Sequence, residues 1–365
     1  MRVLFECEHG YYWPQFAPVA RELLRRPGYE VALSRPVDRS TEDLAPLRLD
    51  PLSAQLVHLK AAREPERLRR IRDWDPQWIF IGNKHTFTRL KRPHNRVIMI
   101  YHGIGLKQSY YRDLPRGIDA VAVESPHRMD LLRARGFRDE QLILTGFTKL
   151  DDLPPLTAEQ RTDILERLGL NPDQPAVLYA PTFYPSSVET ILPWLADQPP
   201  REQWIVALHA FSWTRNKYRR QRQWAERLRS SPGVRVLLPG EQSLLSILPG
   251  TDLLVTDISS VLFEYLALNR PIIHFLKLRL RWKHRWLPWI LRRRLDLDRL
   301  EAVDFSVPVD QIGDLYSMVE DQLQHPDRLK SRRDRAIRRY LYRVDRQAAK
   351  RLIDSLESRY RNSRS

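Results

Sequence analysis

The sequence contains very little cysteine, because Cys7 is the only one in 365 residues. A single thiol excludes a disulfide within the chain and a zinc site built from several cysteines, and it suits a reducing compartment. No uninterrupted apolar run reaches the roughly 18 residues of a membrane-spanning helix. The first residues, "MRVLFECEHG", carry charges where the apolar part of a signal peptide would lie. We therefore expect a cytoplasmic protein, peripheral on the inner face of the cell membrane.

Acidic residues are outnumbered, since 45 Asp and Glu stand against 61 Lys and Arg and give a net charge of +16. Such an excess indicates an anionic partner: nucleic acid, acidic lipid headgroups or a phosphorylated substrate. The hydrophobic share of 42% is sufficient for packed interiors, which makes this a globular chain. Its length suits two domains better than one.

Short apolar strands alternate with amphipathic helical segments along most of the chain. Examples are "RVLFECEHG" and "NRVIMIYHG" in the first half, and "PAVLYAPTF" and "DLLVTDISS" in the second. This alternation predicts an α/β protein with parallel sheets covered on both faces. We expect two Rossmann-like domains, at residues 1–152 and 172–330, facing a central cleft. The acid- and proline-rich segment from 153 to 171 is the predicted linker, and helices at 331–358 are expected to pack back on the first domain.

The strongest candidate site lies in "TDLLVTDISSVLFEYLALNRPIIHF". An apolar strand ends at Asp257, itself a cleft candidate, and a helix is expected to begin near Ser259 and Ser260. Free backbone N–H groups and two hydroxyls would meet there, which is an arrangement suited to phosphate. The interpretation as an ordinary serine cap is the alternative. Thr182, at the end of "VLYAPTF", is a further candidate phosphate contact.

Histidines follow several predicted strands. His102 lies on a turn with Gly103 and Gly105, where a backbone can approach a ligand closely, and Lys107 follows as a candidate phosphate contact. A histidine in such a loop is positioned for acid–base chemistry. His209, in "VALHAF", holds the corresponding position in the second half. His9, in "ECEHGYYW", is a third cleft candidate.

The segment from 277 to 294 mixes aromatic residues with cations, a pattern suited to the headgroup region of an anionic membrane surface. The predicted contacts are Trp282, Trp286, Trp289 and Arg285. A basic surface helix whose tryptophans pack on the domain is the alternative. No helix-turn-helix, RNA-recognition or zinc-finger pattern accompanies the charge, so nucleic acid is not an expected partner. No metal-binding motif is present, and we expect neither a metal nor another cofactor.

The ordered set "YHGIGLK", "GFTKLDD", "VLYAPTF", "VALHAF" and "DLLVTDISSVLFEYLALNRPIIHF" resembles the CDP-glycerol glycerophosphotransferases, the teichoic-acid primases and polymerases. The resemblance covers about residues 95–355. It implies a glycosyltransferase-B fold with the active site between two domains. It also implies transfer of a polyol phosphate, most simply glycerol phosphate, from a CDP-activated donor to a hydroxyl of a membrane-linked polymer or glycolipid.

Site roles follow from the resemblance position by position. His102 resembles the family's general base, and His209 the second histidine near the donor phosphates. Ser259 and Ser260 resemble phosphate contacts. Glu264 occupies the position of the family acid, and its distance from Pro271 matches the spacing of the ribose-binding carboxylate in nucleotide-sugar transferases of this fold type.

Three departures accompany the resemblance. Ile104 and Gly105 replace the Thr-Pro of the family's His-Gly-Thr-Pro-Leu-Lys, and Ala210 follows the second histidine in place of proline. Lys149, the third candidate phosphate-binding cation, stands where the family has arginine, so a point charge replaces a planar fork. Two alternatives stay open: a nucleotide-sugar glycosyltransferase for capsule or lipopolysaccharide, and a non-catalytic basic protein that binds membrane or nucleic acid.

Overall fold

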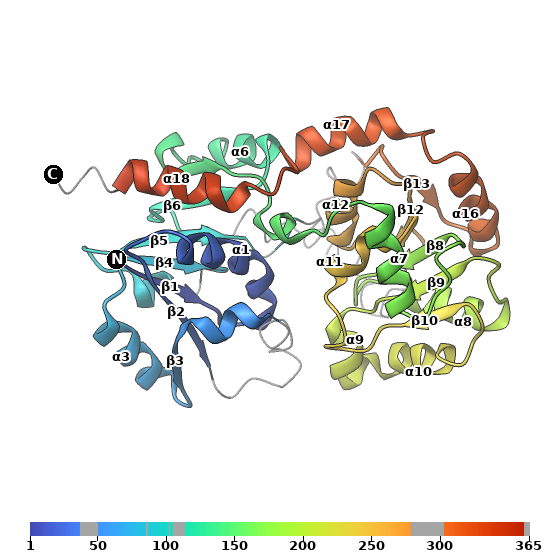
Figure 1. Ribbon diagram of the computed structural model, residues 1–365, viewed down its shortest axis with the longest axis horizontal. Coiled ribbons are helices and arrows are strands. Elements are labelled where there is room, and N and C mark those ends of the chain that lie inside the picture. Colours follow the sequence, from blue (N-terminus) through green and yellow to red (C-terminus); the bar gives the residue numbers. More distant parts are fainter. Residues whose placement is uncertain (37–49, 85–86, 102, 105–113, 279–302, 361–365) are drawn as a thin grey trace, which may run out of the picture. The chain divides into compact units, whose positions relative to one another are not determined.

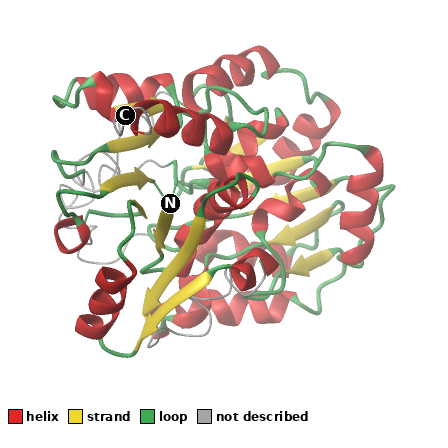
Figure 2. Cartoon of the chain, turned by 60° about the vertical axis from the view of Figure 1, so that its left-hand side comes forward, coloured by secondary structure: helices red, strands yellow, loops and turns green. Residues whose placement is uncertain are grey.

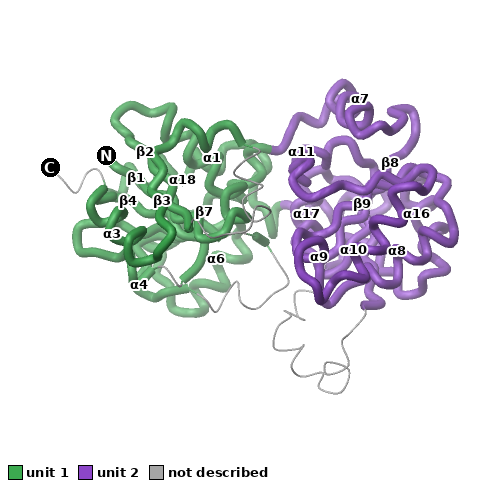
Figure 3. Tube along the Cα trace, turned by 90° about the horizontal axis from the view of Figure 1, so that it is seen from below, with its two compact units in different colours: residues 1–104, 109–152, 338–365 green, residues 105–108, 153–337 purple. Residues whose placement is uncertain are grey.

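The computed structural model describes residues 1–36, 50–84, 87–101, 103–104, 114–278 and 303–360. The chain divides into two compact units, which Figure 3 colours separately. Unit 1 contains the described residues of 1–152 and 338–360, and unit 2 those of 153–337. Each unit is built on one parallel sheet covered by helices (Figures 1 and 2). The predicted α/β class is confirmed.

Unit 1 has a seven-stranded sheet in the order β3-β2-β1-β4-β5-β6-β7. Its strands are β1 (Arg2–Glu6), β2 (Glu30–Pro36), β3 (Val57–Ala61), β4 (Trp78–Ile81), β5 (Arg96–Ile100), β6 (Ala120–Val123) and β7 (Leu142–Leu144). Its helices are α1 (Trp13–Leu24), α3 (Glu64–Trp74), α4 (Phe87–Leu90), α6 (Pro126–Arg133) and α18 (Ala348–Tyr360).

Side chains alternate across the strands of unit 1, so both faces of the sheet are apolar. Val3 and Phe5 point to a core that also includes Leu352 and Leu356 of α18, whereas Leu4 belongs to the core on the other face. Helices α1 and α18 pack together on the first face. The C-terminal helix is therefore part of the N-terminal unit, although more than 300 residues separate it from β1.

Unit 2 has a six-stranded sheet in the order β10-β9-β8-β11-β12-β13. Its strands are β8 (Ala176–Tyr179), β9 (Gln203–Val206), β10 (Val234–Val236), β11 (Leu253–Thr256), β12 (Ile272–Phe275) and β13 (Val307–Val309). Its helices are α7 (Ala158–Arg167), α8 (Val188–Asp197), α9 (Ala210–Thr214), α10 (Arg219–Leu228), α11 (Leu244–Ile247), α12 (Val261–Tyr265) and α16 (Leu315–Gln324). Helix α17 (Lys330–Tyr340) spans the division between the units at residue 337.

The segment predicted as a linker, 153–171, belongs to unit 2 and is largely helical. Thr157 caps α7 by accepting a hydrogen bond from the Gln160 backbone N–H at 3.2 Å. Ile164 and Leu165 of this helix are fully buried. A Cβ added to Gly250 would lie 2.5 Å from Ile164, so α7 packs directly on the chain that precedes β11. The acid- and proline-rich composition therefore marked the beginning of unit 2, and helix α7 in this segment is part of that unit.

Strands β3 and β13 were not among the predicted strands. Both lie at an edge of their sheet. β3 carries His58 and Lys60, and β13 carries Pro308, which is tolerated because an edge strand pairs on one side only. Short edge strands with polar residues or proline lack the continuous apolar run that identifies a central parallel strand.

Candidate functional site

In unit 2 the strand order reverses between β8 and β11, which are neighbours in the sheet although two other strands separate them in the sequence. The loops after these strands diverge to opposite sides of such a reversal, and ligands bind at the carboxyl ends of the strands at this point. Thr182 follows β8, and Asp257 follows β11 directly. The predicted phosphate-site residues of this unit therefore lie at the position where its topology favours a ligand.

Asp257 holds the two loops together. Its fully buried carboxylate accepts hydrogen bonds from the Thr182 backbone N–H at 2.7 Å and from the Ser187 backbone N–H at 2.9 Å. The Ser187 hydroxyl donates a third at 2.9 Å, and Tyr179 completes the chain through a 2.8 Å contact between its hydroxyl and that of Ser187. Ser186 lies nearby, and its hydroxyl donates to the Thr182 carbonyl at 2.7 Å.

The Asp257 network corrects one part of the sequence interpretation. Thr182 was predicted as a phosphate contact, but its backbone N–H is already bonded to Asp257, so the prediction now rests on its hydroxyl. Burial raises the pKa of Asp257 to about 6, against the opposing effect of these hydrogen bonds. Since the carboxylate is enclosed, Asp257 positions the two loops, and its place as a cleft residue stays a prediction.

Ser259 and Ser260 follow this anchored aspartate. Ser259 is buried, and its hydroxyl accepts a weak hydrogen bond from the Val261 N–H at 3.4 Å. Ser260 is half-buried, precedes α12, and makes no side-chain capping bond there. Helix α12 is only five residues long, so its dipole adds little, and the hydroxyls are the principal polar groups. Glu264 is 3% exposed on this helix, and its contact with a ribose stays a prediction.

His209 ends the loop after β9 and caps α9. Its Nδ1 accepts the Phe211 backbone N–H at 3.1 Å, so the neutral ring carries its proton on Nε2. The side chain is exposed. The ring packs against Phe183 at 4.7 Å and Phe211 at 4.9 Å between centroids. This arrangement fixes the orientation of the imidazole at the surface of unit 2.

Phe183 and Tyr218 extend this aromatic cluster, with their ring centroids 5.6 Å apart. The sequence interpretation did not include either residue, or Phe211. Phe183 stands directly after Thr182 in the loop held by Asp257, and therefore connects that loop to His209. The only sequence signal for it was its place immediately after a strand-end candidate.

Unit 1 has a corresponding reversal between β1 and β4. His9 lies in the loop after β1, where its ring stacks on Tyr11 at 5.0 Å. Asn83, after β4, donates to Glu8 at 2.9 Å and to the Tyr12 hydroxyl at 2.7 Å. His9 is thus placed at a strand-order reversal, as its sequence position suggested. The surrounding tyrosines and Asn83 were not predicted, although "HGYYW" shows the aromatic pair.

Glu6, the last residue of β1, forms a buried ion pair with Arg67 of α3. Both carboxylate oxygens lie 2.6 Å from Arg67 Nη1, which also donates to the Ser34 hydroxyl at 2.7 Å. Burial raises the pKa of Glu6 to about 7, although the guanidinium opposes this shift. The pair fixes α3 against the end of β1 and is enclosed, so we assign it a structural role.

The segment around Lys149 holds the C-terminal helix. Gly146 has a φ of +89°, which favours glycine. The Asp151 carboxylate accepts the backbone N–H groups of Ala348 at 3.0 Å and Ala349 at 2.7 Å, at the first turn of α18. Lys149 itself is half-buried on the 3-10 helix η4 (Thr148–Asp152) of unit 1, and its phosphate contact stays a prediction. Gly146 and Asp151 therefore have structural roles in the segment that also carries Lys149.

Several predicted site residues lie outside the described part of the chain. They are His102, Gly105, Lys107, Trp282, Arg285, Trp286 and Trp289. Gly103 is described and buried, next to Ile104, which is fully buried. Among the described residues, no group of three or more His, Cys, Asp or Glu side chains could hold a metal ion, and no helix is long and apolar enough to span a membrane. The expected metal independence stays a prediction.

Two Rossmann-like units, each with its polar residues at a strand-order reversal, define a fold of the glycosyltransferase-B class. Solved structures agree with this fold. The wall teichoic acid polymerase TagF has a TM-score of 0.65 at 15% identity, covering 99% of this chain and 89% of its own. The UDP-GlcNAc 2-epimerase of Neisseria meningitidis has a TM-score of 0.62 at 15% identity, covering 98% of this chain and 100% of its own.

Residues 75–358 match the sequence profile of the CDP-Glycerol:Poly(glycerophosphate) glycerophosphotransferase family, and the chain belongs to this family. The teichoic acid glycerol-phosphate primase of Bacillus subtilis (strain 168) is 27% identical over 211 residues. That match covers 51% of this chain and 51% of the primase. The chain thus spans about half the length of this curated relative. The predicted family and fold class are confirmed.

Proposed function

We propose that this protein transfers glycerol phosphate from CDP-glycerol to a hydroxyl group of a membrane-linked acceptor in teichoic acid synthesis. In this reaction the acceptor oxygen bonds to the glycerol-bearing phosphorus, the bond from that phosphorus to the CMP oxygen breaks, and CMP leaves. The acceptor proton passes to a base. Family membership supports the reaction class, and the observation that carries the proposal is the exposed His209 side chain, whose orientation is fixed through Nδ1 beside the strand-order reversal of unit 2.

The reaction requires charge neutralisation at the leaving phosphate and an oriented nucleophile. His209 can donate from Nε2 to a phosphate oxygen while its Nδ1 stays occupied by α9. The Ser259 and Ser260 hydroxyls lie in the loop fixed by Asp257 and are the proposed further phosphate contacts. Lys107, Lys149 and Thr182 are proposed in the same role. Each is a donor group of the kind that phosphate oxygens accept.

His102 is proposed as the general base that removes the acceptor proton, and Glu264 as the acid that binds the ribose diol. The proposed acceptor is a cell-surface polymer or glycolipid, reached from the inner face of an anionic membrane. No metal is assigned to the mechanism. Neutralisation of the diphosphate would then come from His209, the hydroxyls and the lysines named above.

Donor screening by thermal unfolding tests the proposed function. A ligand that binds only the folded state raises the unfolding temperature, by the equivalent of about 2.7 kcal/mol at 100 times its dissociation constant. We expect stabilisation by CDP-glycerol, and none by UDP-N-acetylglucosamine at the same concentration. Stabilisation by the UDP-sugar alone would instead identify a nucleotide-sugar enzyme of the same fold. No stabilisation by any nucleotide would favour a non-catalytic basic protein.

A matched pair of histidine variants tests the assignment of the base. His102→Ala should lower turnover by about 10²–10⁴-fold, the usual contribution of general-base catalysis. His325→Ala is the control, because His325 is exposed and its described side-chain contacts are with Asp321 on α16. Transfer of radiolabelled glycerol phosphate to the acceptor measures both. Equal turnover of His102→Ala and the unmodified protein would remove His102 from the mechanism.

A further inference from the structure

A strip of cations begins beside His209 and continues along α10. Residues 209–229 contain seven Lys and Arg side chains and one acid, Glu226. The guanidinium of Arg215 lies 3.6 Å from the ring centroid of Phe211, which packs on His209. The ammonium of Lys217 lies 5.2 Å from the ring of Tyr218 in the same cluster. Exposed positive charge therefore starts next to the imidazole proposed to contact the donor phosphates.

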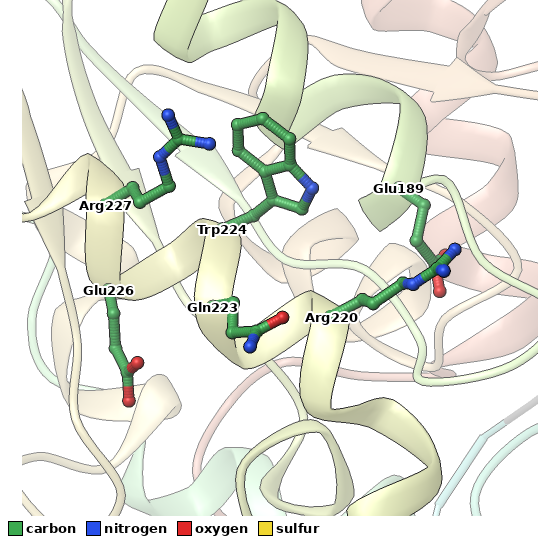
Figure 4. Close-up of a pocket in the computed structure, with 6 residues that line it drawn as sticks. All are labelled: Glu189, Arg220, Gln223, Trp224, Glu226 and Arg227. Atoms are coloured by element: carbon green, nitrogen blue, oxygen red, sulfur yellow. The ribbon is translucent and has the colours of Figure 1, made fainter.

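The strip continues on one face of α10. Arg220, Trp224 and Arg227 are spaced at i, i+4 and i+7, and so share that face. Figure 4 shows them beside a surface hollow of about 740 Å³, with the Arg227 guanidinium 4.7 Å from the Trp224 ring centroid. The opposite face, with Gln221, Ala225 and Leu228, is buried in unit 2. Helix α10 thus presents its basic side outward.

Four arginines of the strip lack an acidic partner in the described parts of the chain. Arg215, Arg219, Arg220 and Arg227 form no ion pair with a described carboxylate, and Glu226 pairs with Arg222 at 3.9 Å. Glu189, which also lines the hollow, accepts from Gln221 at 3.2 Å. Unneutralised charge of one sign along a helix favours an anionic partner.

The length and character of the strip indicate the kind of anion. Ten residues of α10 extend about 15 Å, beyond the diphosphate that His209 would contact. Residues 210–229 contribute none of the large exposed hydrophobic side chains among the described residues, and Trp224 is half-buried against the core of unit 2. A surface that inserts into a bilayer would project such groups. An extended chain of phosphodiesters, which needs only spaced cations, fits better.

We propose that Arg215, Lys217, Arg219, Arg220 and Arg227 bind a polyanionic phosphodiester chain, such as poly(glycerol phosphate), and lead it away from His209. This inference rests on the proposed function for the identity of the chain. Beyond the proposed function, the protein would hold several repeating units of a polymeric acceptor or product at a separate surface. Transfer to an acceptor with one phosphate would not need this surface.

The test compares two doubly charge-reversed proteins. Arg220→Glu with Arg227→Glu alters the strip, and Arg69→Glu with Arg72→Glu alters exposed positions of α3 in unit 1. Each pair changes the net charge from +16 by four units to +12 (16 − 4 = 12), so a general charge effect is the same in both. All four residues are exposed and form no described ion pair, so both proteins should fold.

Binding of a fluorescent synthetic oligo(glycerol phosphate) is measured first, as a function of NaCl concentration. The strip variant should bind at least about tenfold more weakly, with a shallower salt dependence, because two cation–phosphate contacts are lost. The α3 variant should bind like the unmodified protein. The proposal would be overturned if both variants bound the oligomer equally weakly, or if neither bound it more weakly than the unmodified protein. A strip variant that loses binding only to phosphatidylglycerol vesicles would also overturn it, since that result identifies a membrane-binding surface.

Transfer assays then separate this inference from the proposed function. With CDP-glycerol as donor, the strip variant should lose activity on the oligomeric acceptor and keep it on a single-phosphate acceptor. If the unmodified protein transfers nothing from CDP-glycerol but binds the oligomer through the strip, the proposed reaction fails and the polyanion site stands. If both acceptors are used equally well by the strip variant, the site is wrong and the reaction stands.

Discussion

His209 has two roles that different substitutions can separate. Its Nδ1 caps α9 by accepting the Phe211 N–H, and its Nε2–H is proposed to donate to a donor phosphate. Asparagine is a favoured N-cap residue, because its side-chain oxygen can accept the same backbone N–H, but it cannot reach as far as Nε2. Alanine removes both groups. The pair His209→Asn and His209→Ala therefore distinguishes the cap from the phosphate contact.

The two variants should differ in stability and agree in activity. Loss of an N-cap costs about 1 kcal/mol, which corresponds to a fall of roughly 2–4 °C in unfolding temperature for a domain of this size. We expect this fall for His209→Ala and little change for His209→Asn. Loss of one hydrogen bond to a charged phosphate costs about 1.5–3 kcal/mol, so kcat/KM should fall by roughly 10- to 100-fold in both.

Differential scanning calorimetry and initial-rate assays with CDP-glycerol provide the two readouts. Full activity in His209→Asn would refute the phosphate contact through Nε2. A stability loss as large in His209→Asn as in His209→Ala would refute the capping argument, and would point to packing of the imidazole on Phe183 as its main structural contribution.

Three further predictions concern stability and are tested by urea unfolding. Gly82→Ala should cost about 1–3 kcal/mol, because its Cβ would lie 2.7 Å from a buried tyrosine ring, whereas Gly313→Ala, with no atom within 4 Å, should change little. Since the pKa of Asp257 is raised from 3.8 to about 6, its contribution to stability is present at low pH and is lost as pH rises from about 4 to 6. Between pH 5 and 7.5, the free energy of unfolding should therefore fall by about 1 kcal/mol more in the unmodified protein than in Asp257→Asn. Equal falls in the two proteins would contradict the raised pKa of Asp257. Arg67→Met should cost about 3–5 kcal/mol by leaving Glu6 buried and unpaired, and a neutral result would show that Glu6 is already protonated at the assay pH.

The positions of the central strands could be predicted because a strand buried on both faces needs an uninterrupted apolar run. "VLYA", "WIV" and "DLLVT" correspond to β8, β9 and β11, and each is followed by a polar loop as expected. The edge strands β3 and β13 were missed, since one of their sides carries no neighbour and tolerates polar residues and Pro308. Helix α7 lies in the segment predicted as a linker, and its membership of unit 2 was missed because it depends on packing with residues far along the chain.

The sequence by itself determined the residue types and their order: histidines, serines and an aspartate at strand ends, with a net charge of +16 and one cysteine. These follow from local pattern, because side-chain periodicity and loop polarity are properties of neighbouring residues. Only the tertiary structure decided which of these side chains are enclosed and which partners hold them. Parallel pairing of β11 with β8 encloses Asp257 among the donors of another loop, while α9 fixes the orientation of the His209 imidazole through Nδ1. Hydrogen bonds between segments 70 residues apart have no signature in either segment alone, because each partner is chosen by the fold.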